Sequence, residues 1–167
     1  PFEELTRRFV AVAERARTAG VRLGVEPCAW TNIGDLDDAL RIVRDSAMDN
    51  VGLFLDVWHL ARRNLDYDRL LDVDPWLIFG VQLDDVAPLM QGTMAEDCLN
   101  NRLLPGEGIA DTARFVRTLF EIGVSCPFSV EIISDAQRAL PLAEAARVSH
   151  DAAHAVVNAA ARMAAAP

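Results

Sequence analysis

Apolar residues fall into short runs and into helically spaced segments that alternate along the chain. The short runs predict β-strands at VRLGVEP (21–27), VGLFLDVWH (51–59), FGVQLDD (79–85) and FSVEII (128–133). Helical spacing predicts helices from the N-terminus to Gly20 and at 35–47, 67–73, 110–123 and 135–165. Residues 86–109 have no clear period and predict a long functional loop. Strands that alternate with helices indicate βαβ units and a parallel sheet.

Each predicted strand has one apolar face and one face that ends polar. Successive side chains of a strand point to opposite faces, so alternate residues belong together. The apolar sets are Val21, Leu23 and Val25; Leu53, Leu55 and Val57; Phe79, Val81 and Leu83; and Phe128, Val130 and Ile132. This pattern favours strands around a barrel with a site at its carboxyl mouth. An open doubly wound sheet would be apolar on both faces.

The second face of each strand ends in an oxygen-bearing side chain. Glu26, Asp56, Gln82 and Glu131 take equivalent places on the four successive strands. Three carboxylates that converge without a partner would repel one another and raise one another's pKa. A divalent cation removes that repulsion, and oxygen ligands suit Mg²⁺ or Mn²⁺. We therefore predict one divalent metal ion at the barrel mouth.

Composition and charge limit the class of protein. The 167 residues are 51% hydrophobic and carry a net charge of −9, which predicts one globular domain over 1–167 and no nucleic-acid surface. No apolar run approaches the roughly 20 residues of a membrane span, and no signal peptide is evident. The cysteines are odd in number and fit no metal motif: Cys28, Cys98 and Cys126. We predict a reduced, cytoplasmic protein.

Five motifs resemble the second half of a known barrel family. LGVEP, DVWH, VQLDD, RLLPGEG and SVEI, in that order over about residues 1–135, resemble the xylose isomerase-like TIM barrel superfamily. The resemblance is to its sugar phosphate isomerase/epimerase branch, which includes ketose 3-epimerases and inosose dehydratases. It implies an α/β fold, a TIM (β/α)8 barrel of which this chain supplies the last four strands and helices. The expected partner is the missing N-terminal half of the barrel or a second copy of the chain.

The resemblance also implies a ligand set. The family's metal ligands are a Glu, an Asp, a His and a Glu, which correspond to Glu26, Asp56, position 82 and Glu131. Position 82 departs from the family because it is Gln, a neutral oxygen donor. That departure favours a hard ion, Mn²⁺ or Mg²⁺, over Co²⁺ or Zn²⁺.

Three further residues are expected to bind substrate. His59 and Arg102 match substrate-contacting residues of the family, and Glu107 lies in the turn PGEG (105–108). The alternatives are a His59 that is only hydrogen-bonded at a strand end, an Arg102 that is a solvated loop residue or pairs with Glu107, and a Glu107 that acts only indirectly. One of Asp84 and Asp85 should orient a site residue.

The motif HDAAH (150–154) places two histidines at helix spacing but lacks a metalloprotease glutamate. We interpret it as a solvated face of the last helix, because short motifs of this kind often match by chance.

The predicted function is a divalent-metal-dependent isomerase or epimerase acting on a small polyhydroxy carbonyl compound through an enediolate. Glu26 and Glu131 would be the catalytic pair, one removing the carbon-bound proton and the other returning it. The alternative is a metal-dependent dehydratase (lyase) of inosose or dehydroshikimate type. A second alternative is a non-catalytic barrel relic or binding protein. The acidic charge disfavours an endonuclease of the same fold.

Overall fold

Four parallel strands form one sheet in this computed structural model, which describes residues 1–164. The strands are β1 (Leu23–Val25), β2 (Val51–Asp56), β3 (Ile78–Leu83) and β4 (Phe128–Val130). Each strand pairs with the next one along the chain, in the order β1-β2-β3-β4. A doubly wound sheet would reverse its order at a switch point, whereas this order is that of a TIM barrel. The predicted parallel α/β architecture is confirmed.

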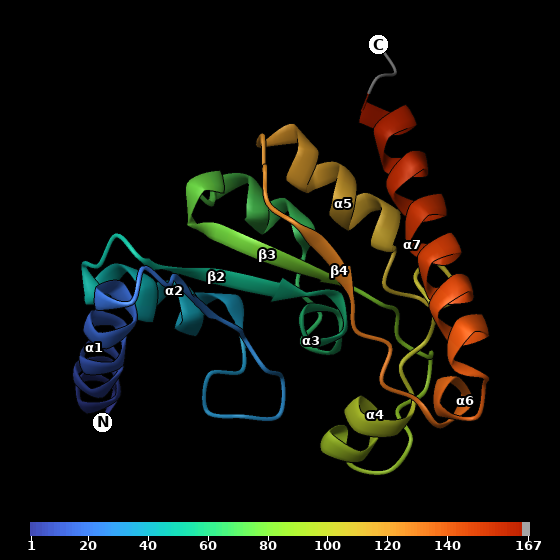
Figure 1. Ribbon diagram of the computed structural model, residues 1–167, viewed down its shortest axis with the longest axis horizontal. Coiled ribbons are helices and arrows are strands. Elements are labelled where there is room, and N and C mark those ends of the chain that lie inside the picture. The colour runs from blue at the N-terminus through green and yellow to red at the C-terminus, as the bar shows by residue number, and fades with distance from the viewer. Residues whose placement is uncertain (165–167) are drawn as a thin grey trace.

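Helices follow the strands and cover one face of the sheet (Figure 1). The α-helices are α1 (Phe2–Thr18), α2 (Leu36–Ser46), α3 (Val57–Arg62), α4 (Met94–Asn100), α5 (Thr112–Glu121), α6 (Asp135–Arg138) and α7 (Leu142–Ala164), with 3₁₀ turns η1 (Tyr67–Asp72) and η2 (Pro75–Leu77). Helices α1 and α2 pack together near β2, and α5 packs on α7. Within residues 1–164 no helix has the length and apolar character needed to cross a membrane.

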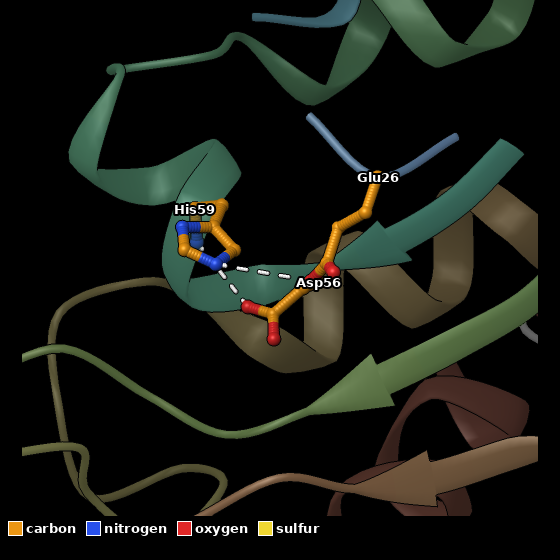
Figure 2. Close-up of side chains that lie close together, drawn as sticks. All are labelled: Glu26, Asp56 and His59. Carbon is orange, nitrogen blue, oxygen red and sulfur yellow. Dashed lines mark hydrogen bonds and ion pairs between the residues drawn. The ribbon is translucent and has the colours of Figure 1, made fainter. Parts of the chain in front are cut away.

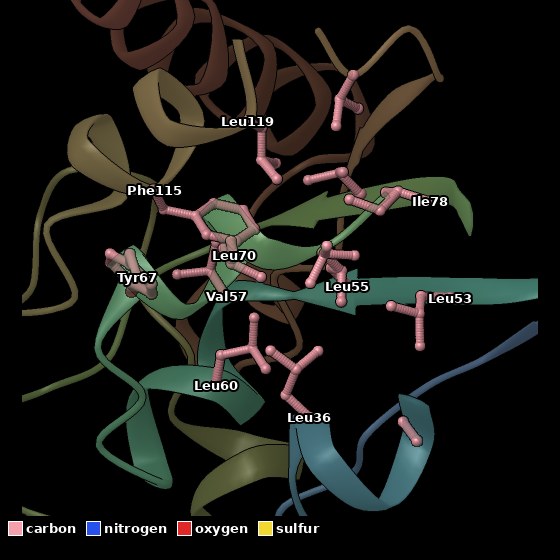
Figure 3. Packing of buried hydrophobic residues seen from close by; sticks show 14 of the residues in the cluster. Leu36, Leu53, Leu55, Val57, Leu60, Tyr67, Leu70, Ile78, Phe115 and Leu119 are labelled. Carbon is pink, nitrogen blue, oxygen red and sulfur yellow. The ribbon is translucent and has the colours of Figure 1, made fainter. Parts of the chain in front are cut away.

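The core lies between the sheet and these helices. Leu53 and Leu55 of β2 are fully buried against Leu36 of α2, Phe115 and Leu119 on the helical side of the sheet (Figure 3). Full burial of such a side chain stabilises the fold by about 1.5–3 kcal/mol. The predicted apolar face of this strand is therefore confirmed, and the opposite face is left for the site.

The prediction of a strand over 51–59 was wrong in its last three residues. The strand ends at Asp56, and α3 begins at Val57. Asp56 caps this helix, since its Oδ1 accepts the backbone N–H of His59 at 3.2 Å. His59 consequently lies in the first helical turn, beside the carboxyl end of β2.

A β-bulge corrects the predicted phase of the third strand. Leu53 pairs with Ile78 while Phe54 pairs with Gly80, so Phe79 is the extra residue. Phe79 then lies on the face of Gly52, where a Cβ would come within 2.8 Å of its ring. Its predicted place on the apolar face was wrong. Beyond the bulge the alternation recovers, and Asp56 pairs in register with Gln82 as expected.

Two helical predictions also change. The segment 86–109 contains α4, which begins with a capping box formed by Thr93 and Glu96. The predicted helix 135–165 divides into α6 and α7 around Pro141, and residue 165 lies outside the described residues.

Candidate functional site

The carboxyl ends of the four strands bring the predicted ligand residues together. Asp56 closes β2 opposite Gln82 of β3. Glu131 follows β4, where its backbone N–H donates to Leu83 O at 3.3 Å, and its carboxylate lies beside the Asp56 and Gln82 side chains. Strand geometry thus gathers side chains that are far apart in the sequence.

Glu26 approaches the same cluster from the end of β1. One carboxylate oxygen of Glu26, one of Asp56 and a ring nitrogen of His59 lie within 4.8 Å of one another. Figure 2 shows these three side chains turned toward a common point. Glu26 Oε1 lies 3.8 Å from His59 Nε2.

His59 is held as a neutral hydrogen-bond donor. The backbone N–H of Ala29 donates to its Nδ1 at 3.2 Å, which places the ring proton on Nε2, 3.8 Å from Glu26 Oε1 and 3.4 Å from Arg102 Nη2. Burial and the nearby Arg102 cation lower the pKa of His59 to about 4. A protonated Nε2 does not ligate a metal, and this favours the prediction that His59 faces substrate.

Arg102 is buried at the centre of the acidic cluster. Its Nη1 contacts Asp56 Oδ2 at 2.6 Å, Asp84 Oδ2, and Glu131 Oε2 at 3.2 Å. Its Nε donates to the backbone oxygen of Cys98 at 3.1 Å. Only 2% of the residue is exposed. The alternatives of a solvated loop arginine and of a pair with Glu107 were therefore wrong.

The carboxyl groups of this cluster, and its buried oxygens that lack a hydrogen-bond donor, fit a bound cation. Four carboxyl groups, those of Glu26, Asp56, Asp84 and Glu131, surround the single cation of Arg102. Burial first, and then the nearby carboxylates, raise the pKa of Glu26 to about 7. Among the described residues Glu26 Oε1 and Gln82 Oε1 are buried without a hydrogen-bond donor. Buried oxygens without donors and an excess of negative charge suit a divalent ion.

The raised pKa of Glu26 gives a stability prediction for metal-free protein. An acid whose pKa is higher in the folded state destabilises the fold once pH exceeds its unfolded value of 4.5. Glu26→Gln should therefore be more stable than wild type above about pH 7, by on the order of 1 kcal/mol after allowance for the 37% exposure of the side chain. This advantage should vanish as pH falls to 4.5. Urea unfolding at several pH values measures it, and an advantage that grows toward low pH would contradict it.

The two aspartates after β3 have different roles. Asp84 contacts Arg102, whereas Asp85 holds the following loop through the backbone N–H groups of Gly106 and Ala110, at 3.0 and 2.9 Å. Gly108 is required there, because a Cβ would collide with the Asp85 carboxylate and with a backbone oxygen. Of the two aspartates, Asp84 is the one that contacts the cluster, and its orienting role stays a prediction.

The histidine motif lies on α7, whereas Glu107 lines the same hollow as Arg102. Glu107 is exposed and borders a hollow of about 350 Å³ beside α6 and α7. His150 and His154 are exposed and stacked on α7, where they line the hollow between α7 and β4, so the interpretation as a solvated face stays a prediction. Sequence reasoning missed Cys98, whose thiol accepts from Arg102 Nη2 at 3.2 Å. No local pattern marks such a contact.

Comparison with known proteins identifies similar barrels. A family model described as xylose isomerase-like TIM barrel matches residues 2–153. The chain is 34% identical over 131 residues to 3-dehydroshikimate dehydratase of Pseudomonas aeruginosa, which covers 78% of this chain and 20% of that protein. It is 29% identical over 136 residues to inosose isomerase of Bacillus subtilis, which covers 78% of this chain and 48% of that protein. The chain thus spans about half, or less, of these relatives.

The fold also matches a solved structure. The crystal structure of the IOLI protein with a binding zinc atom aligns with a TM-score of 0.84 and 25% identity, over 93% of this chain and 56% of that chain. The four-stranded sheet is accordingly part of a TIM barrel.

Proposed function

The chain belongs to the xylose isomerase-like TIM barrel family, and from this membership we propose that the complete barrel is a divalent-metal-dependent sugar isomerase or epimerase. Here the complete barrel means this chain together with the strands that close its sheet. The proposed substrate is a small polyhydroxy carbonyl compound. The inosose isomerase relative supports this class. The single observation that carries the proposal is the convergence of Glu26, Asp56 and Glu131 beside Gln82.

We propose Glu26, Asp56, Gln82 and Glu131 as the ligands of one ion. A bound divalent ion would polarise the substrate carbonyl and its neighbouring hydroxyl. The oxygen-only set favours Mn²⁺ or Mg²⁺ over Zn²⁺ by ligand type. The zinc atom named for the similar IOLI structure supports a divalent ion in general.

Glu26 and Glu131 are the proposed proton carriers. The pKa of Glu26, about 7, suits a base that works near neutral pH. One of the two carboxylates takes the carbon-bound proton and the other returns it. The Nε2–H of His59 would donate to a substrate oxygen, which fixes the substrate between them. Arg102 and Glu107 remain further candidates for substrate contact, although Arg102 would first have to leave its carboxylate partners.

The dehydratase reaction is the second candidate. The 34% identity to 3-dehydroshikimate dehydratase favours it. Removal of the same proton, followed by loss of hydroxide from the next carbon, would use the same two carboxylates.

We propose that the remaining half of the barrel, or a second copy of the chain, completes the sheet. The outer edges of β1 and β4 have no strand beside them within residues 1–164. A mainly apolar hollow of about 420 Å³ lies between β4 and α7, lined by Leu83, Phe128 and Val130. Such a surface favours burial by further strands. The free state of all three cysteines fits the cytoplasmic location that we propose.

Solvent exchange tests the proposed chemistry. The complete barrel, loaded with Mn²⁺ and incubated with candidate sugars and inososes in D₂O, should place deuterium on the carbon next to the carbonyl. An isomerase or epimerase gives a rearranged product of unchanged formula, whereas a dehydratase gives a product that has lost water. Metal-dependent turnover to a rearranged product without solvent deuterium in product or recovered substrate would contradict proton exchange at this carbon.

A further inference from the structure

Asp84 is a buried carboxylate that the proposed reaction does not use. It follows β3 by one residue and is fully buried. Its Oδ2 accepts from Arg102 Nη1, and its Oδ1 is buried without a donor among the described residues. Burial and the nearby Asp56 carboxylate raise the pKa of Asp84, whereas the Arg102 cation that contacts it lowers that pKa and supplies its counter-charge.

Arg102 connects Asp84 to two of the proposed ligands. The same Nη1 atom that contacts Asp84 lies 2.6 Å from Asp56 Oδ2 and 3.2 Å from Glu131 Oε2. The other groups of the guanidinium are fixed as well, through the backbone oxygen and thiol of Cys98 at 3.1 and 3.2 Å. The cation therefore has a defined position between the ligands and Asp84.

A free guanidinium in this position would compete with a metal ion for the same carboxylates. Asp84 also accepts from Nη1 of Arg102, so part of the attraction of this cation is directed to Asp84 and not to the proposed ligands. Asp56 meanwhile accepts one backbone N–H at Oδ1 and one Arg102 N–H at Oδ2. Each carboxylate oxygen offers about two lone-pair sites, so both oxygens keep one site for a metal ion.

We propose that Asp84 is a positioning residue that acts through Arg102 to hold Asp56 and Glu131 in their metal-binding arrangement. This inference rests on the proposed function, because it assumes that Asp56 and Glu131 ligate an ion. Partners that orient metal ligands typically contribute 10- to 100-fold to metal affinity. Removing the charge of Asp84 would leave Arg102 to pair more tightly with the ligands themselves.

Binding of Mn²⁺ to the complete barrel, measured by titration calorimetry, tests this role. Asp84→Asn should weaken Mn²⁺ binding by about 10- to 100-fold. The matched control is Asp97→Asn: Asp97 is also fully buried and pairs with Arg62 at 2.5 Å, but touches none of the proposed ligands. The control should change the dissociation constant by less than about threefold. If both variants bind Mn²⁺ with equal affinity while wild type binds it tightly, the role of Asp84 is overturned and the proposed function is not.

A double variant tests whether Asp84 acts through Arg102. The Asp84→Asn and Arg102→Gln substitutions together remove both buried charges, so neither is left unpaired. In the Arg102→Gln background, Asp84→Asn should cause no further loss of Mn²⁺ affinity. A further tenfold loss would overturn the inference. Wild-type protein that binds no Mn²⁺ at all would instead overturn the proposed function.

Discussion

Asp56→Ala is expected to abolish Mn²⁺ binding by the complete barrel and, with it, turnover. Asp56 is fully buried and stands between Arg102, the His59 backbone and the Gln82 side of the sheet. Its removal would delete a proposed charged ligand and leave Arg102 short of one partner. We expect affinity to fall by more than about 100-fold, beyond the range found for indirect partners. Calorimetric titration with Mn²⁺ measures the loss.

Stability has to be separated from ligation in this experiment. Breaking a buried ion pair costs about 3–5 kcal/mol, and loss of the α3 cap adds about 1 kcal/mol. Asp56→Asn keeps the cap oxygen and the shape while it removes the charge, so it should fold better than Asp56→Ala and still bind poorly. His59→Ala is the functional control, and it should bind Mn²⁺ normally but turn over slowly. A folded Asp56→Asn protein with wild-type affinity would refute ligation by Asp56.

The second large effect is expected from Glu26→Gln and Glu131→Gln. Each substitution keeps an oxygen that can face a metal ion but removes the group that carries a proton. Positioned acids and bases typically contribute 10²- to 10⁴-fold to rate, so kcat should fall within that range in each variant. Steady-state kinetics at saturating Mn²⁺ measures this, because saturation separates proton transfer from any loss of metal affinity.

The separate roles of Glu26 and Glu131 can also be distinguished. If one residue removes the proton and the other returns it, one variant should still exchange the substrate proton with solvent while forming little product. Glu14→Gln is the control, since Glu14 is exposed on α1 and has no role in the proposed site. Variants of Glu26 and Glu131 with undiminished turnover would contradict their role as proton carriers.

The strand pattern was enough to predict that side chains at the carboxyl ends of neighbouring strands converge. Period-two alternation placed Asp56 and Gln82 on one face, and they are paired neighbours in the sheet. The same reasoning failed at Phe79, because a bulge adds one residue and reverses the phase locally. The ligation itself stays a prediction.

Helix ends were less visible in the sequence. Val57 and Trp58 continue an apolar run, and this run predicts a strand that continues through them. In the structure Asp56 instead caps a helix that begins at Val57. Helix α4 was missed as well, yet Thr93 and Glu96 have the spacing of a capping box that could have revealed it.

The burial of Arg102 could not be predicted from its neighbours in the sequence. Its partners Asp56 and Asp84 lie 46 and 18 residues away and meet it only when the strands align. An arginine in a loop is ordinarily solvated, so local composition favoured the wrong environment. Contacts of this kind are set by the tertiary fold.

The position of a bound ion tests the central claim most directly. Crystals of the complete barrel grown with Mn²⁺ should give one anomalous-scattering peak at the carboxyl ends of the strands. We predict that oxygens of Glu26, Asp56, Gln82 and Glu131 surround this peak at about 2.0–2.6 Å, with His59 Nε2 outside the coordination sphere. A closed barrel in which these carboxylates point apart, or in which Mn²⁺ binds elsewhere, would contradict the claim.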